Sequence, residues 1–175
     1  MANLLVDIGN TSLKAAWADG ITLGRTFRYQ GERMTDFVIS LTKGERPDIL
    51  VVSSVRKLSQ NNILRLKESC ERFIFIDKEV LENHNLPSYL TSDRAASVIA
   101  SRYLFKGKKC TVFDLGTIIS ADFIDEDGNY EGGVISPGCM TRFKSVNRYS
   151  KYLPLLDMPE DIEKKGLSLS SSICS

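Results

Sequence analysis

A short pattern that occurs twice constrains the fold of this 175-residue chain more than any other feature. In each copy an apolar run ends in an aspartate, a glycine follows two residues later, and a second apolar run leaves the glycine. The first copy spans residues 4–14 around Asp7, and the second spans residues 111–124 around Asp114. Apolar runs separated by such glycine turns are typical of paired β-strands. Because the copies lie about a hundred residues apart, they predict two related halves.

The first turn carries groups that can hold a phosphate or a metal ion. Glycine lets a ligand approach the backbone, whose amides can bind phosphate, and Thr11 and Lys14 add a hydroxyl and a cation. Asp7 can hold a metal ion or its water. An ordinary hairpin with a solvated aspartate would produce the same pattern. A pair of such turns is similar to the actin, hsp70 and sugar-kinase fold, in which both turns grip the phosphates of one ATP.

Composition argues against several classes of protein. The apolar share of 42% is enough for a core, and a net charge of +1 without a basic stripe argues against nucleic acid as a partner. None of the four cysteines belongs to a Cys-x-x-Cys pair and the only histidine is His84, so we expect reduced thiols and no zinc site. We see no secretion signal and no apolar run near about 18 residues, so we expect a cytoplasmic protein without a membrane segment.

Local patterns predict an α/β chain in which three strands and a helix occur twice. In the first half they predict further strands at 13–18, 21–29, 49–52 and 73–76, a helix from Thr35 to about Gly44, and a helix capped by Ser59. Residues 77–91 are expected to be a connector, and 92–105 a helix with its C-terminal cap at Gly107. In the second half, strands at 111–115, 119–125 and 130–135 precede a helix from 140 to about 152 and a loop at 154–165.

A second candidate site, Ser92-Asp93-Arg94, lies at a predicted helix start. Free helix amides and the helix dipole stabilise an ionised Asp93, which can accept a proton from a substrate hydroxyl in phosphoryl transfer. Arg94 can hold a substrate carboxylate through two parallel hydrogen bonds. A helix cap at Asp93 beside a surface ion pair of Arg94 would account for the same residues. The glycine-rich stretch 132–138 allows a close approach by a ligand or partner chain, and a bulge or turn explains it equally well.

Four motifs in this order resemble the type III pantothenate kinase family, ATP-dependent enzymes that begin coenzyme A synthesis in many bacteria. They are residues 7–14, Asp93-Arg94, residues 114–117 and residues 132–138, and the resemblance covers nearly the whole chain.

The resemblance implies an acetate and sugar kinase, hsp70 and actin-like α/β fold with two ribonuclease-H-like halves. The halves would be residues 1–91 and 110–175, with a connecting helix at 92–109. Relatives continue past the position of Ser175, so the second half is expected to be incomplete.

The resemblance also implies roles for single residues. Asp93 would be the general base that takes the hydroxyl proton of pantothenate, and Arg94 would bind the pantothenate carboxylate. Asp114 would hold a monovalent cation, potassium or ammonium, and Thr117 would contact ATP. The other implied ATP contacts are Asp7, Ile8, Gly9, Asn10, Thr11, Ser12, Leu13 and Lys14. Magnesium would accompany ATP, and the protein would be a homodimer.

The chain departs from the family pattern on the pantothenate side, where Ser92 is a further expected contact. Thr91 replaces the glycine of the Gly-x-Asp-Arg motif, and His84 stands where the family usually has a substrate-contacting tyrosine. Leu169 replaces a threonine whose hydroxyl meets pantothenate, and a buried partner left unpaired there would cost roughly 1–3 kcal/mol. Two alternatives therefore stay open: a non-catalytic nucleotide-binding relative with a regulatory or sensing role, and a kinase for a different hydroxylated acid.

Overall fold

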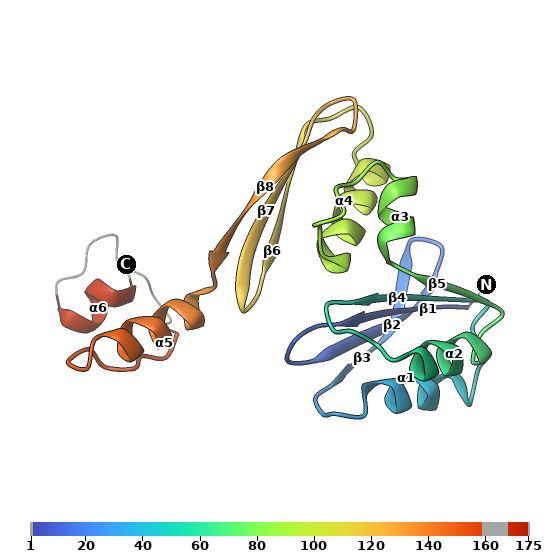
Figure 1. Cartoon of the computed structure of the whole chain (residues 1–175), viewed down its shortest axis with the longest axis horizontal. Helices are drawn as coiled ribbons and strands as arrows, with labels where there is room; N and C mark the ends of the chain where they lie inside the picture. The colour runs from blue at the N-terminus through green and yellow to red at the C-terminus, as the bar shows by residue number, and fades with distance from the viewer. Residues whose placement is uncertain (1, 159–167, 175) are drawn as a thin grey trace. The chain divides into compact units, whose positions relative to one another are not determined.

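The computed structural model describes residues 2–158 and 168–174, which form two compact units (Figure 1). The N-terminal unit is Met1–Tyr103 and the C-terminal unit is Leu104–Ser175. The boundary falls at the end of the helix that the sequence predicts after residue 92. The predicted halves at 1–91 and 110–175, joined by a helix at 92–109, stay a prediction.

A five-stranded mixed sheet with the order β3-β2-β1-β4-β5 organises the N-terminal unit (Figure 1). Its strands are β1 (Asn3–Ile8), β2 (Leu13–Asp19), β3 (Thr22–Tyr29), β4 (Ile49–Ser54) and β5 (Arg72–Phe75). Central β1 pairs antiparallel with β2 and parallel with β4. The hairpin between β2 and β3 turns at Gly20, whose φ of 57° favours glycine. The sequence predicts all five strands, with small differences at their ends.

Helices α1 (Met34–Thr42) and α2 (Gln60–Glu68) cover one face of this sheet (Figure 1). Alternate residues of β1, namely Leu4, Val6 and Ile8, belong to the core on that face and are at most 4% exposed. Val38 of α1 and Leu66 of α2 complete the centre of this core and are fully buried. Burial of β1 on this face fixes which of its residues face the opposite side, because side chains alternate along a strand.

Helices α3 (Lys78–Asn83) and α4 (Ser92–Leu104) lie on the other side of the sheet (Figure 1). The prediction of α4 is confirmed, whereas the prediction of a connector over 77–91 is wrong where it overlaps α3. Asp77 starts α3, because its Oδ1 accepts hydrogen bonds from two backbone amides of the first turn at 3.0 and 3.2 Å. This helix of six residues buries only Leu81, so its sequence lacks the apolar periodicity that would have indicated a helix.

The C-terminal unit repeats the first three strands and first helix of the N-terminal unit. An antiparallel sheet with the order β6-β7-β8 precedes helix α5, which confirms the predicted repetition. The elements are β6 (Cys110–Leu115), β7 (Ile118–Ile124), β8 (Tyr130–Pro137), α5 (Cys139–Tyr149) and α6 (Leu169–Cys174). Residues 154–158 have no helix or strand, as predicted, and the rest of that predicted loop lies outside the described residues. The sequence pattern predicts no helix where α6 lies.

Two leucines of α2 allow a test of the core. Leu66 is fully buried, whereas Leu64 on the same helix is 56% exposed. We expect Leu66→Ala to lower the free energy of unfolding by about 2–5 kcal/mol, because it removes buried methyl groups and leaves a cavity. Leu64→Ala should change it by less than about 1 kcal/mol. Urea unfolding followed by circular dichroism measures both, and equal losses would contradict the packing of α2 described above.

Candidate functional site

The turn between β1 and β2 is tight, and the atoms that it offers to a ligand are mainly backbone atoms. The Gly9 amide donates a hydrogen bond to the Ser12 carbonyl at 3.0 Å, and a Cβ on Gly9 would lie 3.1 Å from the same oxygen. Ile8 and Leu13, which flank the turn, are at most 1% exposed and point into the core. Their predicted contacts with ATP could therefore only be made by backbone atoms, whereas Thr11 is exposed.

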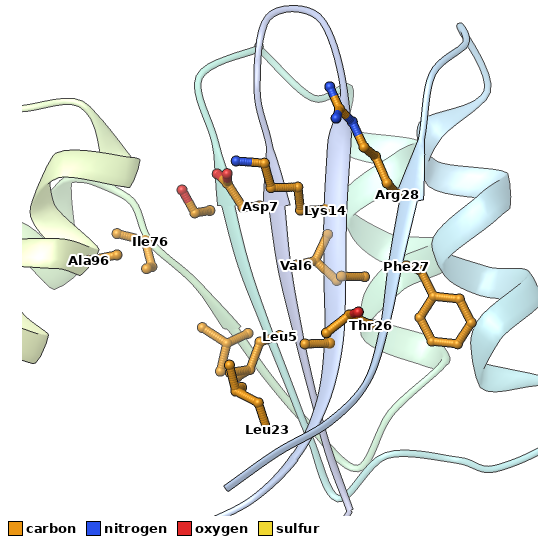
Figure 2. Close-up of a pocket in the computed structure, with 14 residues that line it drawn as sticks. Leu5, Val6, Asp7, Lys14, Leu23, Thr26, Phe27, Arg28, Ile76 and Ala96 are labelled. Atoms are coloured by element: carbon orange, nitrogen blue, oxygen red, sulfur yellow. The ribbon is translucent and has the colours of Figure 1, made fainter. Parts of the chain in front are cut away.

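Asp7 and Lys14 lie directly opposite each other in the β1–β2 pairing, on the sheet face away from the core. Both line a cavity of about 750 Å³ that lies within the N-terminal unit (Figure 2). Figure 2 shows the Lys14 side chain extending toward the Asp7 carboxylate at one end of the cavity. Further along, the lining is largely apolar, with Leu5, Ala16, Leu23, Val51, Ile76 and Ala96. The cavity thus has one charged end beside the turn and an apolar remainder.

Ser92 fastens the start of α4 to the end of β4. Its Oγ accepts a hydrogen bond from the Ser54 amide at 3.0 Å and lies 3.2 Å from the Ser53 Oγ, and Ser92 is 9% exposed. Ser53 in turn pairs with Asp7, since β4 and β1 run parallel and in register. The carboxyl ends of parallel strands meet at one edge of a sheet, where α/β proteins bind ligands. The predicted catalytic helix start and the predicted phosphate turn therefore share this edge.

Asp93 and Arg94 differ in exposure. Asp93 is half-buried in the first turn of α4, and its Oδ1 accepts a hydrogen bond from the Arg94 amide at 2.8 Å. Arg94 is only 6% exposed, which argues against the alternative of a surface ion pair.

A second cavity of about 380 Å³ lies beside the start of α4 and is lined by Thr91 and Ser92. Three cations, Arg56, Lys57 and Lys78, line it together with one carboxylate, Asp77, which already accepts the hydrogen bonds that begin α3. The Arg56 guanidinium also donates to the Asn10 carbonyl in the β1–β2 turn. This cavity therefore adjoins the phosphate turn and has an excess of positive charge that suits a small anion.

The two other departures from the family pattern on the pantothenate side are His84 and Leu169. His84 is the exposed C-cap residue of α3, its carbonyl accepts a hydrogen bond from Arg102 Nη1 at 2.6 Å, and it does not line the 380 Å³ cavity. Leu169 is the first residue of α6 in the C-terminal unit and is 56% exposed. Of the two N-terminal positions that depart from the family pattern, Thr91 lines this cavity and His84 does not.

The second turn, between β6 and β7, packs against the glycine-rich stretch. The Thr117 carbonyl accepts hydrogen bonds from the Gly138 amide at 3.0 Å and from the Thr141 hydroxyl at 2.5 Å. A Cβ on Gly138 would lie 2.1 Å from the Gly116 carbonyl oxygen, so a side chain there would force the backbone to shift. The glycine-rich stretch also contains the bulge that the sequence left open, because Gly132 has a φ of 132° next to a register shift between β7 and β8.

Asp114 is exposed near the end of β6, where it pairs with Ser120 of β7. A cavity of about 490 Å³ in the same unit is lined by Thr117, Cys139 and Met140 but not by Asp114. Among the described residues, no three His, Cys, Asp or Glu side chains cluster closely enough to hold a metal ion. A cation at Asp114 would thus depend on backbone or substrate oxygens for its other ligands.

The fold defines a class of protein, since solved structures of the acetate and sugar kinase, hsp70 and actin-like class share it. A Campylobacter jejuni protein assigned to the Baf family of transcriptional activators matches with a TM-score of 0.60 and 20% identity, over 98% of this chain and 71% of that one. A Listeria monocytogenes protein assigned as an N-acetylmannosamine kinase matches with a TM-score of 0.50 and 15% identity, over 85% of this chain and 64% of that one. The predicted fold class is confirmed.

Sequence comparison places the chain within that class. A sequence model of the type III pantothenate kinase family matches residues 3–173. The type III pantothenate kinase of Flavobacterium johnsoniae is 31% identical over 98% of this chain and 72% of its own length, and that of Phocaeicola vulgatus is 33% identical over 98% and 72%. The chain belongs to the type III pantothenate kinase family, as its motifs predicted.

The contact between Gly138 and the second turn can be tested by adding one methyl group. Gly138→Ala should destabilise the C-terminal unit by about 1–3 kcal/mol, because its Cβ overlaps the Gly116 carbonyl and the backbone must shift. Gly116→Ala is the control, since its Cβ would lie 3.7 Å from the nearest carbonyl oxygen. Hydrogen–deuterium exchange of β6 to β8 measures the effect. Equal exchange in the two variants would mean that the two motifs do not pack together.

Proposed function

We propose that this protein transfers the terminal phosphate of ATP to the primary hydroxyl of pantothenate, forming 4'-phosphopantothenate in the first step of coenzyme A synthesis. Membership of the type III pantothenate kinase family supports the reaction. The structural observation that carries the proposal is the shared sheet edge, where Ser92 ties the start of α4 to β4 beside Asp7. A proton acceptor at that helix start and a phosphate site at the turn would meet there.

In this mechanism Asp93 acts as general base. Its carboxylate accepts the proton of the pantothenate hydroxyl while the hydroxyl oxygen attacks the terminal phosphorus of ATP, and ADP leaves with the electrons of the broken phosphorus–oxygen bond. A single positioned carboxylate is enough, because phosphoryl transfer depends mostly on alignment and on charge stabilisation. Arg94 would bind the pantothenate carboxylate, and the cations of the 380 Å³ cavity would favour the same anion.

The backbone of residues 8–13, with the side chains of Asp7 and Lys14, would bind the ATP phosphates, and Thr117 would add a contact. Asp7 fits a magnesium site, because protein sites for Mg²⁺ commonly supply one or two carboxylates and leave the other positions to phosphates and water. Bound magnesium would neutralise charge on the transferred phosphate. Asp114 would hold potassium or ammonium.

The remaining parts of the proposal follow the family. The protein would act as a homodimer in the cytoplasm, on pantothenate and ATP. No helix in residues 2–158 or 168–174 is long and apolar enough to cross a bilayer. Thr91, which lines the candidate acceptor cavity where the family has glycine, is a departure with a direct bearing on the acceptor. The test must therefore also distinguish two alternatives: a non-catalytic nucleotide-binding protein, and a kinase whose substrate is another hydroxylated acid.

Asp93→Asn tests the catalytic assignment, because asparagine keeps the size and polarity of aspartate but cannot take the proton. We expect the turnover number for pantothenate phosphorylation, with magnesium and potassium present, to fall by roughly a hundredfold or more while ATP binding persists. Asp36→Asn is the control, since Asp36 is also an acid in a first helix turn but forms an exposed ion pair with Arg65 at 2.7 Å. Product mass and calorimetric ATP binding are the two measurements.

Unchanged turnover in Asp93→Asn would contradict the base assignment. Wild-type protein that binds ATP but makes no phosphorylated product from pantothenate would overturn the proposed function. Screening other hydroxylated acids with the same protein would then separate the non-catalytic alternative from a change of substrate.

A further inference from the structure

A row of four polar side chains crosses the sheet at the level of Asp7. The pairing places Ser53 of β4 beside Asp7 of β1, Asp7 opposite Lys14 of β2, and Lys14 opposite Arg28 of β3. Residues that pair directly share one face of a sheet. All four line the 750 Å³ cavity, and Arg28 belongs to none of the motifs that the sequence singled out.

The pair of Lys14 and Arg28 is costly for an isolated sheet. Like charges directly opposite each other on neighbouring strands destabilise a sheet, and both side chains lie on the same face. Within residues 2–158 and 168–174 the side chain of Arg28 forms no hydrogen bond and no ion pair. Asp7 carries one negative charge against these two positive charges. The row therefore has a net positive charge that a bound anion would neutralise.

Protection of a sheet edge is the structural alternative, since β3 is an edge strand and cations on edge strands discourage pairing with other chains. Protection of the edge does not require a cation to lie opposite any particular residue of β2. Arg25 on the same strand could protect the edge without lining the cavity, and its guanidinium lies 4.9 Å from the Phe27 ring. The position of Arg28 opposite Lys14, beside the phosphate turn, is not explained by edge protection.

We propose that Arg28 is a second cationic ligand for the terminal phosphates of the nucleoside triphosphate, next to Lys14. The inference rests on the proposed function in taking ATP as the phosphate donor. Neighbouring strands lie about 4.8 Å apart, so cations on two of them can contact different oxygens of one polyphosphate. Figure 2 shows Arg28 at the same end of the cavity as Asp7 and Lys14, above the apolar part around Leu5 and Leu23. Guanidinium groups bind phosphate oxygens in pairs, which strengthens the contact.

Binding measurements on the full chain test this assignment with two variants of Arg28. Arg28→Gln keeps much of the side-chain length but removes the charge, and we expect it to weaken the binding of ATP and of inorganic triphosphate by about 10- to 100-fold. Arg28→Lys keeps the charge but loses the paired hydrogen bonds, and its loss of affinity for ATP and triphosphate should be smaller than that of Arg28→Gln. The affinity for AMP should be the same in the wild type and in both Arg28 variants. Arg25→Gln is the control and should leave the three affinities unchanged.

Two further measurements separate ligand binding from a structural role. Without ligand, the melting temperature of Arg28→Gln should equal or exceed that of the wild type, because the like-charge pair is removed. The affinity of Arg28→Gln for ATP should also fall less steeply with salt concentration than that of the wild type. A lower melting temperature together with unchanged ATP affinity would overturn the proposal and indicate a structural residue.

The outcomes for Arg28 and for the proposed function are distinct. Loss of ATP and triphosphate binding in Arg28→Gln supports the assignment even if the wild type does not phosphorylate pantothenate. Pantothenate phosphorylation with the same Michaelis constant for ATP in wild type and Arg28→Gln would keep the proposed function and overturn the role of Arg28. Equal loss of affinity in Arg25→Gln and Arg28→Gln would also overturn it, because general surface charge would then explain the effect. A wild type that binds neither ATP nor triphosphate refutes both.

Discussion

The pairing of β1 with a neighbour on each side is the constraint on which the N-terminal unit depends. Antiparallel pairing with β2 brings Lys14 opposite Asp7, and parallel pairing with β4 brings Ser53 beside it. The buried residues of β1 hold this register, because a shift by one residue would expose Leu4, Val6 and Ile8 to water. The hydrophobic core thus determines where the polar side chains of the opposite face stand.

The start of α4 takes its position from the same sheet. Ser92 is buried and bonds to the end of β4, so the helix start that carries Asp93 cannot move independently of the strand that pairs with β1. A functional group on a helix start held by a strand end is placed more accurately than one on a free loop. The loop after β4 also contacts this region, since Arg56 donates a hydrogen bond to the Asn10 carbonyl of the phosphate turn.

Sequence patterns predicted the strands, the repetition of three strands and a helix, and the family. They succeeded because apolar runs, glycine turns and Asp-x-Gly motifs are local features that depend on few neighbours. Helix α3 escaped prediction, because one buried leucine gives no periodicity. The sequence did not single out Arg28 for a different reason. Arg28 pairs with Lys14 across two strands, and a motif along the chain does not show such a pairing. The need for glycine at residue 138 likewise arises from its contact with Gly116, which only the folded unit shows.

The alternation along β1 has a consequence for how the protein can diverge. Packing of the core constrains Leu4, Val6 and Ile8. The ligand that occupies the cavity constrains Leu5 and Asp7 instead. Selection for stability and selection for chemistry therefore act on interleaved positions of one strand rather than on separate segments. A single substitution at a cavity-facing position can change the ligand contacts without disturbing the packed face. An insertion or deletion in β1 would instead turn core-facing residues toward the cavity and cavity-facing residues toward the core. Lineages with this strand should vary by substitution there and keep its length.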